Sequence, residues 1–151
     1  MSAAIVPVPA VNAAVFNSKR EILLTRRSHA VRESGKWCLP GGHFEPGELW
    51  QTAVEREVQE EVGLKVESLK LVGVYSDPEL TVTAEPVSNG RRAQFIVALF
   101  LITQYSGEIR PNEEVDAWDW FPVDRLPAPI LKSHPIRVLD AHAFKGEAFI
   151  R

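Results

Sequence analysis

Short apolar runs separated by polar turn residues fill the first part of the chain, and this pattern predicts strands. Residues 3–16 (AAIVPVPAVNAAVF) are almost all apolar and are expected to form one or two strands. A turn over residues 17–20 leads to a second strand-like run, residues 21–26. The polar residues 27–36 are expected to form a loop, and residues 37–39 after it predict another short strand.

The spacing becomes that of a helix after a glycine turn at residues 40–42. Strong helix formers run over residues 48–62 and stop at Gly63, which predicts a helix with a glycine at its end. The apolar positions on it are Ala53, Val54, Val58 and Val62. Because these positions share one face of a helix, we expect them to pack on a sheet.

Strand patterns return after this helix. Residues 66–76 predict a strand, and residues 80–84 and 94–104 flank an Asn-Gly pair at positions 89 and 90. Asn-Gly between two strand-like runs is a strong hairpin signal, so a hairpin is expected here. A further short strand is expected around Trp118 and Phe121, and residues 136–144 have the apolar spacing of a C-terminal helix. The chain therefore predicts a mixed sheet between helices.

Composition and charge narrow the class of protein. With 151 residues, 45% of them hydrophobic and 25% charged, the chain is expected to form a single globular domain over residues 1–151. A net charge of −3 argues against a nucleic-acid polymer as the main partner. The start of the chain has no basic leader, and the longest apolar run, residues 95–102, is too short to span a bilayer. With one cysteine, Cys38, no internal disulfide can form, so a cytoplasmic protein without membrane partners is expected.

Acidic residues gather near the end of the predicted helix. Residues three and four apart on a helix are neighbours, so Glu57, Glu60 and Glu61 are expected to converge on one face. Three such carboxylates repel one another, and nothing nearby in the sequence neutralises all of them. A hard divalent cation such as Mg²⁺ or Mn²⁺ takes oxygen ligands and commonly bridges carboxylates to a substrate phosphate. The glycine turn ahead of the helix would let backbone groups approach such an ion closely.

The spacing around these acids resembles the box of the Nudix hydrolase family. That box runs Gly, five residues, Glu, seven residues, then Arg-Glu-aliphatic-x-Glu-Glu-x-Gly-aliphatic. The residues of this chain that fit it are Gly42, Glu48, Arg56, Glu57, Val58, Glu60, Glu61, Gly63 and Leu64. The resemblance implies an α/β/α sandwich with a mixed β-sheet, and metal-dependent hydrolysis of a diphosphate linkage by attack of water at phosphorus.

The resemblance also implies roles for individual residues. The implied metal ligands are the carbonyl of Gly41 and the carboxylates of Glu57, Glu60 and Glu61. Glu48 and Arg56 resemble the pair that orients the helix against the loop, a task suited to the planar guanidinium. The general base is left open between Glu60, Glu61 and an acid further along, Glu114 or its neighbour Glu113.

Substrate identity is left between two branches of the family. The segment LVGVYSDPE with Pro78 resembles ADP-ribose pyrophosphatase-like proteins, which also act on nucleoside diphosphate sugars. The segments LPGGHFEPGE and WDWFPVDRLP resemble the branch that cleaves nucleoside triphosphates to monophosphate and pyrophosphate. The candidate substrate contacts are Tyr75, Arg27 and His43, with Trp37, Phe95 and Trp120 as further aromatic candidates. A non-catalytic nucleotide sensor is the alternative function, and a homodimer is a possible assembly.

Overall fold

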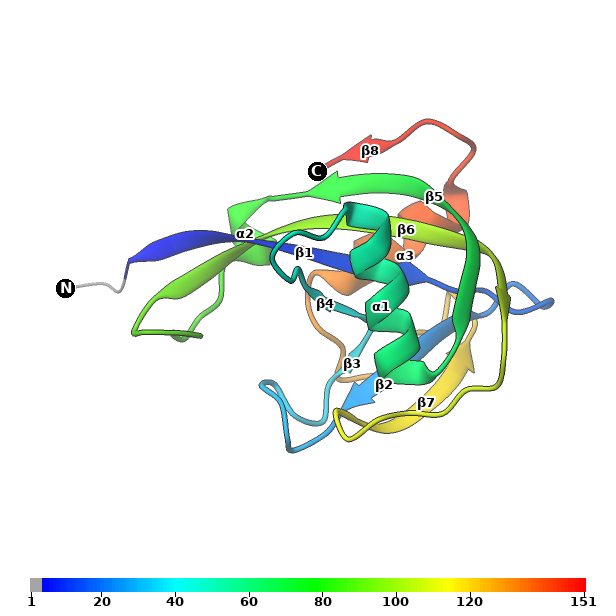
Figure 1. Ribbon diagram of the computed structural model, residues 1–151, viewed down its shortest axis with the longest axis horizontal. Coiled ribbons are helices and arrows are strands. Elements are labelled where there is room, and N and C mark those ends of the chain that lie inside the picture. Colours follow the sequence, from blue (N-terminus) through cyan, green and yellow to red (C-terminus); the bar gives the residue numbers. More distant parts are fainter. Residues whose placement is uncertain (1–3) are drawn as a thin grey trace.

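The larger of two sheets forms the centre of the molecule. The structure, a computed structural model, describes residues 4–151, so the first residue of the predicted strand 3–16 lies outside the described part. In spatial order the strands of the larger sheet are β4 (Gly41–His43), β1 (Ile5–Ala14), β6 (Arg92–Ser106), β5 (Lys65–Tyr75) and β8 (Phe149–Ile150). β1 runs parallel to β6 and antiparallel to β4, whereas β5 is antiparallel to β6. The sheet is therefore mixed, as predicted (Figure 1).

A smaller antiparallel sheet lies beside the larger one. Its strands, in spatial order, are β3 (Trp37–Cys38), β2 (Ile22–Arg27) and β7 (Val115–Phe121). The chain passes from β3 to β4 within a few residues, so the glycine turn connects the two sheets. This connection holds the turn at a fixed place between them.

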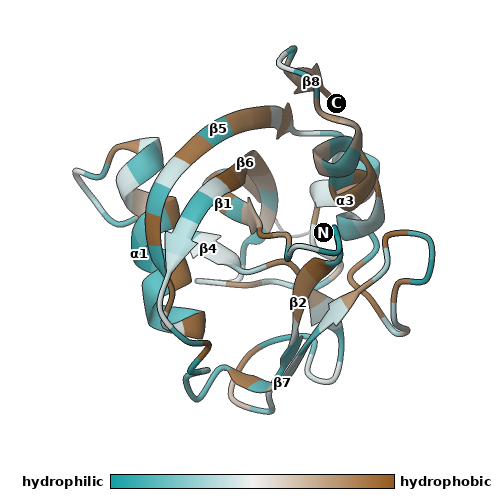
Figure 2. Cartoon of the chain, turned by 90° about the vertical axis from the view of Figure 1, so that its right-hand side faces the viewer, coloured by the Kyte–Doolittle hydropathy of each residue, from teal (hydrophilic) through white to brown (hydrophobic). Residues whose placement is uncertain are grey.

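Helices cover both faces of the larger sheet, which confirms the predicted α/β/α arrangement. α1 (Trp50–Val62) and α3 (His134–Ala143) lie on opposite sides of it in Figure 2, and the short α2 (Pro78–Thr81) follows β5. Along residues 4–151, no helix has the length and apolar character needed to cross a bilayer.

Two apolar cores hold these layers together. The predicted stripe on α1 is buried against the sheet, with Val54, Val58 and Val62 fully enclosed beside Val11 and Phe100. Each such side chain contributes on the order of 2 kcal/mol through burial. The second core lies under α3. Its buried residues include Leu24, Leu39, Val72, Leu99 and Val138. Both cores are built on β1 and β6, so the centre of the sheet fixes α1 relative to α3.

The end of α1 follows the sequence prediction closely. Gly63 adopts φ 75°, and its N–H donates to the carbonyl of Gln59 at 3.0 Å. A residue with a side chain is disfavoured in this left-handed conformation, which is why glycine ends the helix. The helix begins at Trp50, two residues after the predicted start, because Glu48 lies in the loop and binds Arg56 from there.

The structure corrects the predicted hairpin. Residues 80–84 do not form a strand, because Pro78 begins a helical turn that Asp77 caps by accepting a hydrogen bond from the N–H of Glu79. Only an isolated bridge joins Val82 to Gln94, and the Asn-Gly pair closes a small local turn. A proline at the first helical position and an Asp before it favoured the helix. The first apolar segment is a single strand, β1, and not a pair.

Candidate metal and nucleotide site

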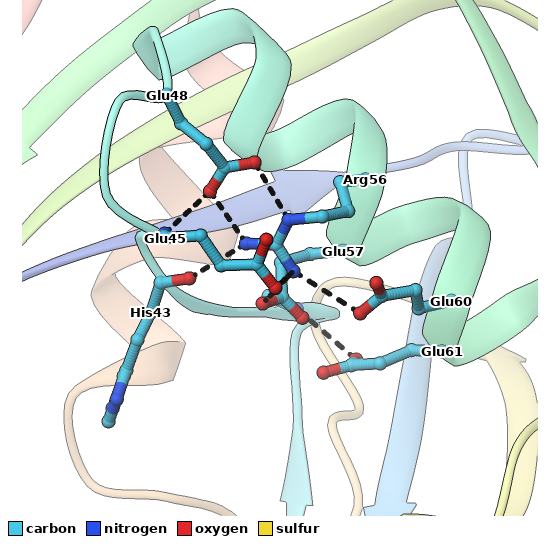
Figure 3. A network of polar contacts seen from close by, with 8 residues as sticks. His43, Glu45, Glu48, Arg56, Glu57, Glu60 and Glu61 are labelled. Atoms are coloured by element: carbon cyan, nitrogen blue, oxygen red, sulfur yellow. Dashed lines mark hydrogen bonds and ion pairs between the residues drawn. The ribbon is translucent and has the colours of Figure 1, made fainter.

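The glycine turn lies directly against α1. A Cβ on Gly42 would be 2.5 Å from Oε1 of Glu57, which is closer than non-bonded atoms approach. The N–H of Gly41 lies 3.3 Å from Oε2 of Glu61. A side chain at position 42 would therefore displace the carboxylate of Glu57, whereas glycine leaves room for it beside the turn. Two carboxylates of the helix are thereby set beside backbone groups of the turn (Figure 3).

Arg56 joins the helix to the loop that precedes it. Its Nε donates to Glu48 at 2.7 Å and its Nη2 at 2.8 Å, which is a two-pronged pairing. Nη2 also donates to the carbonyl of His43 at 3.0 Å. This pairing lowers the pKa of Glu48 to about 2 and raises that of Arg56, so both groups keep their charges at neutral pH. The contacts agree with the orienting role that the sequence suggested for the pair (Figure 3).

Glu57 and Glu61 are buried carboxylates, which is unusual for charged groups. Glu57 is 9% exposed and Glu61 is 8% exposed. Burial raises the pKa of Glu57, although the Arg56 guanidinium at 3.0 Å opposes the shift. Burial raises the pKa of Glu61 further, and the charge of Glu57 adds to that effect. Arg56 contacts Glu57 but not Glu61, so the two buried carboxylates, when both are ionised, carry more negative charge than Arg56 offsets, and a cation would relieve the excess.

The other expected acids lie at different distances from this pair. The side chain of Glu60 is 54% exposed and turns toward Arg56, whose Nη1 donates to it at 3.2 Å (Figure 3). The charge of Glu114 raises the pKa of both Glu57 and Glu61, so its carboxylate lies within Coulombic range of the pair. Glu113 shows no such influence, and its carbonyl accepts a hydrogen bond from Ser28. The structure therefore favours Glu114 over its neighbour.

These residues fit a hard divalent cation. The donor set consists of carboxylate oxygens beside a glycine turn, which is the chemistry that Mg²⁺ and Mn²⁺ prefer. Within residues 4–151, no three acidic, histidine or cysteine side chains are already gathered tightly enough to hold an ion. Glu57 and Glu61 are the buried members of the expected ligand set, whereas Glu60 is exposed and pairs with Arg56.

A cavity of about 740 Å³ opens beside the glycine turn. Its cationic lining residues are Arg27, Arg32, Lys36, Arg92, Lys132 and Arg137, and its acidic ones are Glu33, Glu79 and Glu85. The bias toward cations contrasts with the net charge of −3 of the whole chain. A cavity of this size accommodates a nucleotide, and its positive lining favours an anionic one.

Two of the three predicted substrate contacts line this cavity. His43 lies at the turn with its ring centroid 5.3 Å from that of Phe95, and burial with the charges of Arg32 and Arg27 lowers its pKa. Arg27 lines the same cavity. Tyr75 does not: its hydroxyl donates to Asp140 at 2.8 Å, and it lines a smaller neighbouring cavity of about 350 Å³.

The remaining aromatic candidates divide in the same way. Phe95 lines the large cavity, whereas Trp37 packs edge-on against Phe121 and Trp120 packs against the core under α1. Neither tryptophan lines the cavity. From their strand positions, both tryptophans were equally plausible as core residues, and in the structure both pack against other apolar side chains.

Sequence reasoning missed the polar groups that α3 brings to the cavity. Arg137 is 3% exposed, and its Nη1 donates to Oδ1 of Asn12 at 2.8 Å. His134 is also buried, and its Nδ1 accepts the N–H of Leu39 at 2.9 Å. A charged arginine inside an apolar helical spacing was the signal in the sequence. Its significance depends on what lies opposite, which no local pattern reveals.

Comparison with known proteins places this geometry in context. A family model described as NUDIX domain matches residues 6–141. An ADP-ribose pyrophosphatase from Methanocaldococcus jannaschii is 30% identical, with 80% of this chain and 65% of that protein covered. The human 8-oxo-dGDP phosphatase NUDT18 is 36% identical, with 82% of this chain and 35% of that protein covered. The crystal structure of a MutT NUDIX hydrolase from Burkholderia pseudomallei matches with a TM-score of 0.73 at 29% identity, covering 89% of this chain and 98% of that one.

The relatives from Methanocaldococcus jannaschii and human are both longer than the segment that aligns with this chain. The chain spans 65% of the first and 35% of the second. The similarity therefore concerns the domain that carries the glycine turn, α1 and the cavity.

Proposed function

The chain belongs to the Nudix family, because the family model matches residues 6–141, and we propose that it hydrolyses the diphosphate linkage of a nucleoside diphosphate joined to a further group. The observation that carries this proposal is the buried pair Glu57 and Glu61 against the turn of Gly41 and Gly42. Such a pair is costly to fold unless a cation occupies the site in the working protein. We also propose that residues 4–151 act as one domain.

The proposed ligands are Glu57, Glu60, Glu61 and the carbonyl of Gly41. A bound Mg²⁺ or Mn²⁺ supplies positive charge that offsets the charge of the diphosphate. Arg56 and Glu48 hold α1 against the turn, so the carboxylates keep their positions. Cationic side chains of the cavity, Arg27 among them, bind the phosphate charge that extends away from the carboxylates.

A carboxylate takes the proton from the attacking water. Glu61 is a candidate for this role because it is buried beside the glycine turn, where the N–H of Gly41 lies 3.3 Å from its Oε2. Glu60 and Glu114 are the alternatives, since both lie within electrostatic reach of the same place. Water attack at phosphorus needs no covalent nucleophile. Cys38 is accordingly left out of the mechanism: burial raises its pKa and keeps it a thiol.

The substrate class follows from both the cavity and the relatives. Proteins similar to this chain are described as acting on ADP-ribose and on 8-oxo-dGDP, which share a nucleoside diphosphate. We propose a substrate of that kind, either a nucleoside triphosphate or a nucleoside diphosphate sugar such as ADP-ribose. The cavity supports this choice, because it combines cations with the apolar side chains of Val11, Leu39 and Val97.

Replacing Glu61 by Gln tests the proposal. The purified protein is incubated with Mg²⁺ or Mn²⁺ and a panel of nucleoside triphosphates, ADP-ribose, other nucleoside diphosphate sugars and dinucleoside polyphosphates, with products read by mass. We expect turnover by the wild type and a loss of about a hundredfold or more in the variant. The matched control is Glu55→Gln, because Glu55 is exposed on the same helix. Near-normal turnover by the Glu61 variant would contradict the catalytic role assigned to Glu61.

The panel also separates the enzyme from a nucleotide sensor. If a nucleotide binds but none is cleaved with either metal, the sensor function takes the place of the hydrolase. The predicted homodimer and cytoplasmic location stay predictions, which sedimentation and cell fractionation can measure.

A further inference from the structure

Hydrogen-bond donors line the large cavity where α3 begins. They belong to Ser133, His134 and Arg137, which we call the floor of the cavity. Because Nδ1 of His134 accepts the N–H of Leu39 at 2.9 Å, the neutral ring carries its proton on Nε2 and is a donor there. A guanidinium has donors only. The floor therefore suits a ligand that presents acceptors.

Arg137 is a buried cation without an anionic partner. Within residues 4–151 its guanidinium donates one hydrogen bond, from Nη1 to Asn12 Oδ1 at 2.8 Å, and its Nε is buried without any acceptor. Asp140, one helical turn away, instead accepts the hydroxyl of Tyr75 and both prongs of Arg151. A buried polar group left without a partner is costly. Because Nε is enclosed by the protein, a ligand in the cavity would meet the N–H groups of Nη1 and Nη2 that Asn12 does not engage.

The walls of the cavity suit a flat ring. Leu39 and Val97 supply apolar surface, and Phe95 supplies an aromatic face next to the ring of His43. A free phosphate prefers solvated cations over walls of this kind. Exposed cations line the cavity as well: the guanidinium of Arg32 lies 6.0 Å from the ring centroid of Phe95, and Lys132 precedes Ser133. The combination of apolar and aromatic side chains with buried donors favours a base, and binding of phosphate at the same place is an outcome that the test distinguishes.

We propose that Arg137, together with His134 and Ser133, binds the O6 and N7 acceptors of an oxopurine base and selects it against adenine. This inference rests on the proposed function, since it assigns the base of the same nucleotide substrate. Guanine and hypoxanthine present two acceptors on that edge, which a guanidinium meets in a paired arrangement. Adenine presents an amino donor at position 6, which would face the donors of Arg137 and His134.

Binding of inosine, guanosine and adenosine monophosphates measures the selectivity directly. Inosine and adenosine monophosphate differ at position 6, oxo against amino, and at the adjacent N1, so their ratio reports on this edge of the base while the ribose and phosphate stay the same. Calorimetry in the presence of EDTA keeps the measurement independent of metal and of turnover. We expect both oxopurine nucleotides to bind the wild type about tenfold or more tightly than adenosine monophosphate.

Two substitutions at Arg137 separate recognition from charge. Arg137→Met removes the donors and is expected to abolish the preference, whereas Arg137→Lys keeps the charge but not the fork and is expected to restore little of it. Arg125→Met is the matched control, because Arg125 is exposed and lies outside the cavity. Circular dichroism reports whether each variant is folded.

Several outcomes overturn the inference. Equal binding of inosine and adenosine monophosphates by the wild type does so even if both Arg137 variants fail to fold. A uniform loss for all three nucleotides in Arg137→Met assigns the residue to structure alone. If that variant weakens ribose 5-phosphate as much as inosine monophosphate, the floor binds phosphate and not the base. The hydrolysis panel is scored separately, so turnover without base selectivity leaves the proposed function standing.

Discussion

At the scale of single residues, this protein buries ionisable side chains of a kind that is usually exposed. Glu57 and Glu61 are buried carboxylates, and Arg137 and His134 are buried basic groups. Burial shifts the pKa of each toward its neutral form. Arg56 differs because it has partners on several sides, which keeps it charged. These four buried ionisable residues lie at the proposed metal site and on the cavity floor.

The two-pronged contact of Arg56 gives a residue-scale prediction. Arg56→Lys keeps the charge but loses the fork that binds both oxygens of Glu48. The turn and α1 then lose their alignment, and we expect kcat to fall by about a hundredfold. Steady-state kinetics measures the fall, with circular dichroism as the check on folding. Turnover within a factor of about two of wild type would show that the fork is dispensable.

His134 gives a prediction about pH. Burial and the charge of Arg137 hold its pKa well below 6.5 in the folded chain, whereas the unfolded chain takes up a proton near pH 6.5. The unfolded state therefore binds more protons as pH falls below about 6.5, and the free energy of unfolding decreases there by up to about 1.4 kcal/mol per pH unit. Urea unfolding at pH 5.5 and 7.5 measures the decrease.

His134→Gln is the matched variant for that measurement. Its side-chain oxygen can still accept the N–H of Leu39, but it does not titrate. The titration of Glu57 and Glu61 is common to both proteins and cancels in the difference between them. We expect the wild type to lose more stability than the variant on acidification. Parallel losses would mean that His134 does not contribute.

At the scale of elements, glycine matters to α1 at two places. Gly42 leaves room for Glu57, in the middle of the helix, and Gly63 ends the helix with φ 75°. The two glycines have different roles, because Gly42 shapes the site and Gly63 ends the helix. The helix between them buries an apolar stripe and presents its carboxylates to the turn.

The helix end can be tested without touching the site. Gly63→Ala forces a side chain into the left-handed conformation, and its Cβ would lie 3.2 Å from Cβ of Arg110. We expect the free energy of unfolding to fall by about 1–2 kcal/mol, with kcat retained. Gly63→Asn is the control, because asparagine tolerates this conformation better. Urea unfolding that ranks Ala as stable as Asn would contradict the explanation.

At the scale of the whole molecule, two sheets and two helices bring distant segments to one cavity. The turn comes from the first third of the chain, the α2 segment from the middle and α3 from the end. β1 and β6 carry both cores, so they hold α1 and α3 at a fixed separation. Gly41 and Gly42, which lie beside the proposed metal ligands Glu61 and Glu57, line the same cavity as Arg137 of the proposed base site.

Metal binding should stabilise the whole fold through linkage. A ligand that binds only the folded state adds about 2.7 kcal/mol at a hundred times its dissociation constant. We expect Mg²⁺ to raise the melting temperature of the wild type, since it relieves the repulsion between Glu57 and Glu61. Glu57→Gln and Glu61→Gln should lose most of that rise, whereas Glu55→Gln should keep it. Thermal unfolding over a series of Mg²⁺ concentrations measures the effect, and an equal rise in every variant would contradict the site.

Local patterns in the sequence foretold most of the elements. The stripe of Val54, Val58 and Val62 predicted which face of α1 is buried, and Gly63 predicted where it ends. The box spacing also predicted that Arg56 would bind Glu48. These features depend on residues a few turns apart, so a periodicity can reveal them. The prediction of a hairpin strand at residues 80–84 was wrong, because the helix cap formed by Asp77 and Pro78 outweighs a weak strand pattern.

The sequence by itself determined the match to the family box and the buried face of α1, and it supplied the candidate residues of the proposed metal site. Tertiary structure alone decided that Glu57 and Glu61 are the buried pair, that Tyr75 bonds Asp140 away from the large cavity, and that Arg137 lies on its floor. The physical reason is the range of the interactions. Helical spacing is local, but burial and the lack of a partner depend on segments more than a hundred residues apart, as Asn12 and Arg137 are.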